Sequence, residues 1–230
     1  MAKCYMCDNE STSVEHVPPR CFFPKDMRLN LYTVPACKIH NEDTSKDDEY
    51  ARNIITMSIE NNQTSIDHFF SKSFSSLKRS SALANAIIST LKDVSFYKEN
   101  AKSIQIDRRR FDRTIRKVAY ALFYQEFGYT WERLLAVTTN QIKMGDMSND
   151  HLGDIFDSLS VDLDKFQLKG NNPLIFQYTF FDFTSEKYNK ALFMIFYEVY
   201  ITIEKYTIFQ LKSIPVLIVC EDKKSYLNAG

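Results

Sequence analysis

CYMC at residues 4–7 and CKIH at residues 37–40 are the two stretches that decide how the first part of the chain folds. Each contains two metal-ligand side chains separated by two residues, which lets one tight turn present both to the same ion. A second pair beside the first completes a tetrahedral site, and its metal can replace core burial in a short polar segment. We therefore predict a structural Zn²⁺ ion held by Cys4, Cys7, Cys37 and His40. Ordinary buried cysteines and a surface histidine are the alternative.

The bulk composition is that of a globular protein without membrane spans. Of the 230 residues, 44% are hydrophobic and 25% charged, and the formal net charge is +0. No apolar run reaches the roughly 18–20 residues of a transmembrane helix, and the N-terminus lacks the apolar core of a signal peptide. Five cysteines in such a chain indicate thiols or metal ligands rather than disulfides. We expect a cytoplasmic protein that does not bind membranes.

The residues around the two pairs predict the order strand, strand, helix. Short strands are expected at 13–17 and 29–34, and a helix runs from Ser45 to about residue 61. Ser45 and Asp48 have the spacing of a capping box at the start of this helix. Asp48 is also a candidate third ligand of a catalytic metal, and its alternative role is a carboxylate favoured by the helix dipole.

The rest of the chain changes from helical to β periodicity. Helices are predicted at 81–91 and 109–127, with Gly128 as the stop signal of the second. Strands rich in β-branched and aromatic residues are predicted at 174–183, 191–204 and 214–220, the first two forming an antiparallel hairpin. The predicted class is therefore α+β, with an N-terminal zinc-bound module (1–62), a mostly helical basic segment (63–145) and a β-rich C-terminal region (146–230). The last two could form one domain.

VEHVPP at residues 14–19 lies between the two metal-ligand pairs, and Asn41 follows the second. Histidine titrates near neutral pH and suits a general base, whereas carboxylate and amide oxygens suit Mg²⁺ or Mn²⁺. Successive strand residues point to opposite faces, so Glu15 and His16 can address one phosphate only near a strand end. Pro18 and Pro19 end the strand there. Without a catalytic role, Glu15-His16 would be a surface dipeptide before a turn.

These first sixty-odd residues resemble the HNH (ββα-metal) endonuclease family, in the branch scaffolded by zinc. The resemblance lies in the acidic-His-x-x-Pro run between two zinc pairs and in the Asn that adjoins the fourth ligand. Asn30-Leu31 matches the family's Asn-Leu dipeptide two residues out of register, Glu15 replaces the usual Asp, and a second downstream His is missing. The resemblance implies metal-dependent hydrolysis of DNA, with His16 as general base and Glu15 and Asn41 holding Mg²⁺ or Mn²⁺.

Basic residues concentrate in the middle of the chain. Between 72 and 117 there are twelve Lys or Arg residues but only four Asp or Glu residues. Such an excess suits a surface that grips phosphates, although a solvated helix face would look the same. The candidate nucleic-acid contacts at helical spacing are Arg108, Arg109, Arg113, Arg116 and Lys117.

Two other interpretations compete with an autonomous DNA endonuclease. The first is a non-catalytic zinc-ribbon module that binds nucleic acid or a protein partner. The second is a bacterial defence or toxin effector that stays silent until a regulatory subunit, or a second copy in a homodimer, activates it; family analogy alone suggests this. RNA is a possible substrate in place of DNA, because the chemistry of the site does not select the sugar.

Overall fold

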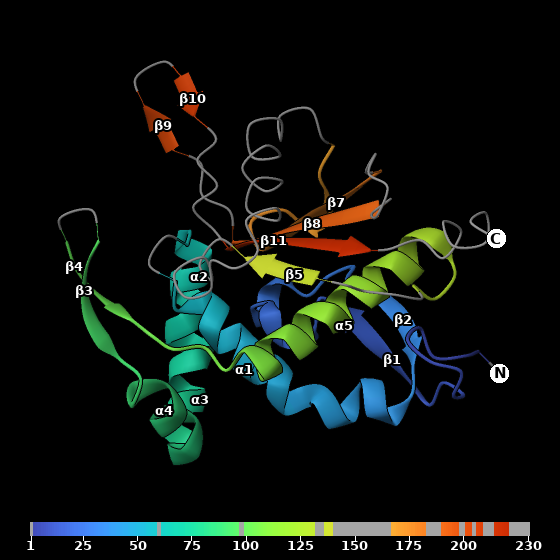
Figure 1. Cartoon of the computed structure of the whole chain (residues 1–230), viewed down its shortest axis with the longest axis horizontal. Coiled ribbons are helices and arrows are strands. Elements are labelled where there is room, and N and C mark those ends of the chain that lie inside the picture. Colours follow the sequence, from blue (N-terminus) through green and yellow to red (C-terminus); the bar gives the residue numbers. More distant parts are fainter. Residues whose placement is uncertain are drawn as a thin grey trace, which may run out of the picture.

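The computed structural model of the chain describes residues 2–58, 61–96, 99–131, 136–139, 167–182, 190–197, 201–203, 206–208 and 214–220. Helices and antiparallel sheets are mixed, as the predicted α+β class requires (Figure 1). The largest sheet comes from the C-terminal part of the chain, and a separate two-stranded sheet lies near the N-terminus.

The N-terminal part has the predicted order of strand, strand and helix. Strand β1 (Ser13–Val17) pairs antiparallel with β2 (Tyr32–Ala36), and helix α1 (Ser45–Thr56) follows. The second strand begins three residues later than the predicted start at 29, because Asn30 takes a left-handed turn conformation with φ of 55° just before it. The predicted capping box is wrong: Thr44 is the N-cap of α1, without a side-chain hydrogen bond.

The middle of the chain is less uniformly helical than predicted. Four short elements lead away from α1: α2 (Gln63–His68), a π-helical turn (Phe69–Ser73), α3 (Phe74–Arg79) and α4 (Ser81–Ile88). An antiparallel hairpin of β3 (Lys92–Phe96) and β4 (Glu99–Ser103) then interrupts the segment expected to be helical. Helix α5 (Arg108–Phe127) ends as predicted at Gly128, whose φ is 78° and whose N–H donates to the Tyr124 carbonyl at 2.8 Å.

The C-terminal strands form a five-stranded antiparallel sheet. Its order is β5 (Ala136–Thr139), β11 (Ile214–Cys220), β8 (Lys190–Phe196), β7 (Phe176–Asp182) and β6 (Lys169–Asn172). The predicted pairing of the strands at 174–183 and 191–204 is present as β7 and β8. However, β8 ends at Phe196, and β9 (Ile201–Ile203) pairs with β10 (Tyr206–Ile208) in another sheet. The first part of the expected β region, 146–166, lies outside the described residues.

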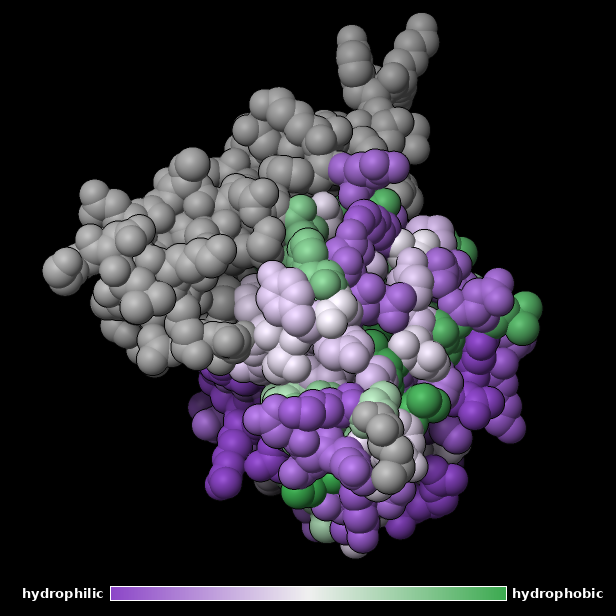
Figure 2. Space-filling view, turned by 90° about the vertical axis from the view of Figure 1, so that its right-hand side faces the viewer, coloured by the Kyte–Doolittle hydropathy of each residue, from purple (hydrophilic) through white to green (hydrophobic). Residues whose placement is uncertain are grey.

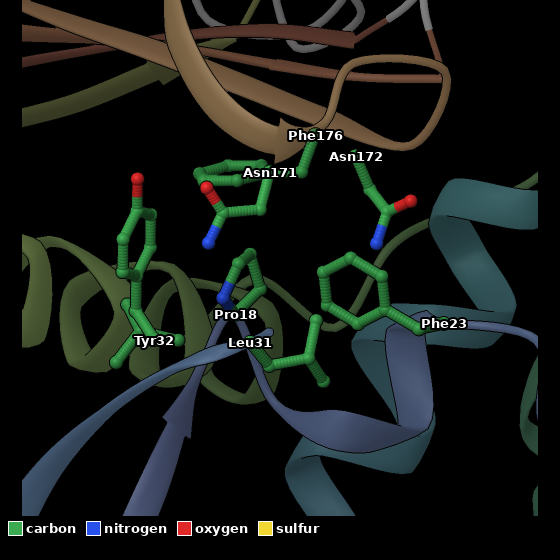
Figure 3. Close-up of a pocket in the computed structure, with 8 residues that line it drawn as sticks. Pro18, Phe23, Leu31, Tyr32, Asn171, Asn172 and Phe176 are labelled. Carbon is green, nitrogen blue, oxygen red and sulfur yellow. The ribbon is translucent and has the colours of Figure 1, made fainter. Parts of the chain in front are cut away.

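The C-terminal sheet holds the long loop between β1 and β2. The Tyr197 hydroxyl lies 2.6 Å from the Phe22 carbonyl, to which it donates, and 2.7 Å from Nδ1 of His68. Asn172 donates to the Met27 carbonyl at 2.8 Å, and Asn171 donates to the carbonyl of Asn30. Figure 3 shows both asparagines reaching toward a small pocket that is also lined by Pro18, Phe23 and Leu31. The loop that follows Glu15 and His16 is therefore fixed from outside the N-terminal module.

A single hydrophobic cluster runs through these parts, from Cys4 and Tyr5 through α1 and α5 to Tyr197. Helix α5 is central to it, since it contacts α1, both strands of the N-terminal hairpin and β5. On the face in Figure 2 the described surface is mainly hydrophilic, and its hydrophobic residues form separate small patches. Of the helices in the described ranges, none combines the length and apolarity that crossing a membrane requires.

The buried ring of His68 predicts a loss of stability in acid. Burial, with the charges of Arg52 and Arg28, lowers the pKa of His68 to about 4, against about 6.5 in an unfolded chain. The unfolded state therefore takes up the proton first, and stability falls as the pH drops from about 6.5 toward 4, by on the order of 3 kcal/mol in total.

Urea denaturation from about pH 7 to 4.5 checks this prediction against His68→Gln, which keeps a polar partner for Tyr197 but does not titrate. The difference in unfolding free energy between the two proteins should shrink as the pH falls. A difference that is constant with pH would contradict it.

Candidate functional site

The four predicted zinc ligands lie together. Their ligand atoms are all within 4.8 Å of one another, and this is the metal-ligand cluster found among the described residues. Sγ of Cys7 is 3.8 Å from Sγ of Cys37, and Nδ1 of His40 is 3.5 Å from Sγ of Cys4 and 3.4 Å from Sγ of Cys37. Tetrahedral zinc would place two sulfurs about 3.8 Å apart and a sulfur and a nitrogen about 3.6 Å apart. The cluster therefore has the dimensions of a zinc site and could hold such a metal.

The backbone builds this cluster onto the hairpin. The N–H of Cys4 donates to the Asn9 carbonyl at 2.9 Å and closes the first turn, and the N–H of Tyr5 donates to the Pro35 carbonyl of β2 at 2.8 Å. Burial raises the pKa of the Cys37 thiol, but the backbone N–H groups of His40 and Ile39 are among the donors that lower it, and the net shift is downward. A lower thiol pKa favours the thiolate, the form that binds metal.

Strand alternation separates the two residues of the Glu15-His16 pair. The Glu15 side chain turns inward and is 5% exposed, whereas His16 on the opposite face is half-buried. The pairing of Glu15 with Val34 and of His16 with Thr33 fixes this orientation. The two candidate catalytic side chains consequently have different environments, one inside the protein and one at the surface.

Glu15 lies in a buried group of polar side chains that the sequence did not reveal. Nζ of Lys117, on α5, is 3.0 Å from Oε2 of Glu15, 2.5 Å from Oδ2 of Asp48 and 2.9 Å from the Thr44 hydroxyl. Burial raises the pKa of Glu15 to about 7, against the opposing effect of the Lys117 charge, and Asp48 adds to the rise. The pKa of Asp48 is also raised, again mainly by burial. Two carboxyl groups thus share one ammonium, which leaves an excess negative charge when both are ionised.

Asp48 has both carboxylate oxygens engaged. Oδ1 accepts a hydrogen bond from the Thr114 hydroxyl at 3.2 Å, and Oδ2 is the atom that contacts Lys117. Asp48 is therefore near Glu15, as a third-ligand candidate should be, but neither of its oxygens is unpartnered. Its position at the start of α1 is also the one at which the helix dipole favours a carboxylate.

His16 faces positive charge. Burial and the charges of Arg20 and Arg28 lower its pKa, so the ring is neutral at neutral pH. Arg20 is exposed, and Arg28 donates from Nε to the Phe23 carbonyl at 3.0 Å. Among the described residues, neither guanidinium forms an ion pair with a carboxylate. A neutral imidazole beside two uncompensated cations is suited to accept a proton near an anion.

Asn41 is tied to the first strand. Its Nδ2 donates to the Ser13 hydroxyl at 2.9 Å and to the Val14 carbonyl at 3.0 Å. Both amide hydrogens are used in this way, which leaves Oδ1 as the atom that could bind a metal ion. Asn41, which follows His40 of the Cys/His cluster, is thus held against β1 at the two positions before Glu15.

The basic residues of α5 are mostly engaged within the protein. Arg110 and Arg113 each reach Asp47 of α1 at 2.8 Å, and Arg108 lies 3.9 Å from Asp112. Lys117 is only 2% exposed, so this member of the predicted nucleic-acid surface is wrongly placed there. Arg109 is exposed and Arg116 is half-buried. The signal that could have identified Lys117 is its place on the apolar side of α5, between Thr114 and Val118, which are also buried.

Comparison of the chain with models of known protein families, with curated protein sequences and with solved structures finds no match.

Zinc removal should destabilise the N-terminal module. Cys37→Ser should lose the bound zinc and lower the thermal midpoint by several degrees, because metal binding contributes folding free energy to the turns that carry the cluster. Zinc content by elemental analysis and thermal unfolding by circular dichroism measure both effects. Cys21→Ser is the matched control and should keep its zinc, since Cys21 is not in the cluster. Equal zinc content in both variants would contradict the ligand assignment.

Proposed function

We propose that the chain is an HNH-type endonuclease that hydrolyses phosphodiester bonds of DNA with the help of a divalent metal. The observation that carries the proposal is the position of Asn41, whose side chain is hydrogen-bonded to β1 directly before Glu15 and His16 and beside the Cys/His cluster. The sequence resemblance to the HNH family rests on these same residues. In this function the zinc is structural, and the hairpin and α1 are the scaffold of the site.

The available donor atoms are of the chemical kind that Mg²⁺ and Mn²⁺ prefer. Oε1 of Glu15 has no side-chain partner among the described residues, and Oδ1 of Asn41 is the amide atom left over after two donated hydrogen bonds. Two oxygen donors suit these hard ions and leave other coordination positions for phosphate and water. The ion would neutralise charge that develops on the phosphate and the leaving oxygen.

The remaining chemistry belongs to His16 of β1 and to two arginines of the loop that follows this strand. His16, neutral at neutral pH, would accept the proton of the attacking water. Arg20 and Arg28 would bind phosphate oxygens on the His16 side and oppose the negative charge of the transition state. Proton transfer at β1 would then lie next to phosphate binding by the loop, which Asn171, Asn172 and Tyr197 hold in place.

A non-catalytic zinc module is the second candidate, and one observation favours it. Lys117 already offsets one of the two negative charges of Glu15 and Asp48, so the group is partly compensated without any catalytic ion. Such a module would use the Arg20–Arg28 face to bind nucleic acid or a protein without cutting. An effector released by a regulatory subunit or a homodimer contact, and an RNA substrate, are variants of the proposed enzyme.

Removal of the base tests the proposed function. His16→Ala should cut supercoiled plasmid about 10²–10⁴-fold more slowly than the wild type in Mg²⁺ or Mn²⁺, with equal zinc in both proteins. Thr33→Ala is the matched control, because Thr33 pairs with His16 across the hairpin and is exposed. Equal cleavage by His16→Ala and the wild type would exclude His16 as the base. Absence of cleavage by a fully zinc-loaded wild type, on DNA and on RNA, would exclude an autonomous nuclease and leave the binding module or an effector that needs its partner.

The location of the phosphate-binding residues gives a separate prediction. In the His16→Ala background, Arg20→Ala and Arg28→Ala should each weaken binding to a DNA duplex. Each should also reduce the slope of the logarithm of the binding constant against the logarithm of the salt concentration by about one, as loss of a phosphate contact does. Fluorescence anisotropy at several salt concentrations measures both quantities. Arg79→Ala removes an exposed arginine of α3 and should leave both unchanged. If Arg109→Ala weakens binding and the two loop variants do not, the surface lies on α5.

A further inference from the structure

The ammonium of Lys117 is the most enclosed charge next to the proposed active site. Its side chain is 2% exposed, and it contacts Glu15, Asp48 and Thr44, which come from three successive parts of the N-terminal module. Lys117 itself lies 102 residues after Glu15, on a helix outside that module. A cation in this position contacts the candidate metal ligand directly.

Only one oxygen of Glu15 is engaged by this contact. Lys117 meets Oε2 at 3.0 Å, and Oε1 has no side-chain partner in the described part of the chain. The backbone N–H of His16 also hydrogen-bonds to the Glu15 carboxylate, so Lys117 and this N–H together orient the group. Asp48 and Thr44 in turn hold the ammonium, at 2.5 and 2.9 Å, and the Thr114 hydroxyl holds Asp48.

We propose that Lys117 is a positioning residue, which fixes Glu15 so that a single carboxylate oxygen is presented to the divalent metal. This inference rests on the proposed function, because it takes Glu15 as a ligand of that metal. Asp48 then acts through Lys117 and does not bind the ion. The catalytic site depends in this way on α5, although all the residues that carry the family resemblance lie before residue 42.

Charge compensation is the alternative role for Lys117. A buried lysine could serve only to offset carboxylates whose desolvation is costly. Any change that keeps the net charge of Glu15, Asp48 and Lys117 would satisfy that role. A positioning role instead needs the ammonium at Oε2 of Glu15. Removal of Lys117 together with one negative charge separates the two roles.

The test is Mn²⁺ binding by the full-length, zinc-loaded protein, followed by electron paramagnetic resonance of the free ion. The double variant Asp48→Asn/Lys117→Met keeps the formal charge of the group at that of the wild type, because it removes one carboxylate and one ammonium. We expect its Mn²⁺ dissociation constant to rise by about 10–100-fold, as for loss of a residue that orients a ligand. An unchanged or tighter dissociation constant would overturn the inference, and a tighter one would show that Lys117 competes with the ion.

A matched control lies one turn earlier on the same helix. Asp47→Asn/Arg113→Met removes the two 2.8 Å ion pairs that Asp47 of α1 forms with Arg110 and Arg113 of α5, neither of which involves Glu15. It should bind Mn²⁺ like the wild type; a loss as large as that of the first double variant would assign the effect to helix packing and overturn the inference. If thermal unfolding shows that the first double variant does not fold, Lys117→Arg decides: it keeps the charge but not the position, so unchanged affinity overturns the inference.

His16→Ala distinguishes failure of this inference from failure of the proposed function. It should bind Mn²⁺ like the wild type and yet not cleave DNA. If the wild type cleaves DNA and the Lys117 variants bind Mn²⁺ as tightly as the wild type, the inference is wrong and the nuclease proposal stands. Mn²⁺ binding that depends on Lys117, without cleavage of nucleic acid by the wild type, supports the positioning role and excludes a nuclease that acts on its own.

Discussion

The contact of Lys117 with Glu15 and Asp48 is the interaction on which the arrangement of the N-terminal half depends. It joins β1, the start of α1 and the middle of α5 at a point with almost no solvent. Each ion loses several kcal/mol of hydration in such a place, so the group is stable only when all of its members are present. Loss of one partner alone would leave a buried charge, at a cost of about 3–5 kcal/mol. The positions of β1, α1 and α5 relative to one another are therefore coupled through these three side chains.

The Cys/His cluster and the C-terminal sheet both stabilise the hairpin, which is weak by itself. Two strands of five residues form at best a marginal structure in water. The Cys/His cluster fastens one end of the hairpin, and the hydrogen bonds of Asn171, Asn172 and Tyr197 fasten the loop at the other. The proposed working residues lie between these two anchors, where the backbone is held from both sides.

The two faces of β1 divide the proposed chemistry. Glu15 faces inward, where burial strengthens its interaction with any cation, whereas His16 faces the Arg20–Arg28 side, where a large anionic substrate can reach it. A metal ligand is best held in a rigid interior position, and a base must meet solvent and substrate. Because side chains alternate along a strand, two neighbouring residues can serve as the inward ligand and the outward base. Both lie close to the end of β1 at Val17.

The sequence by itself determined the local features. The spacing of Cys4, Cys7, Cys37 and His40 predicted their cluster, and periodicity located β1, α5 and β11, because ligand spacing and side-chain alternation are properties of short segments. Two details differ from this pattern: β2 starts later than predicted because of the turn at Asn30, and the hairpin β3–β4 was not predicted. Only the tertiary structure decided which charges are paired. Lys117 looks like the arginines around it in the sequence, and Arg20 and Arg28 look like isolated loop residues. Their roles depend on which carboxylates the fold brings within reach, and contacts across about 70–100 residues of chain have no local signal.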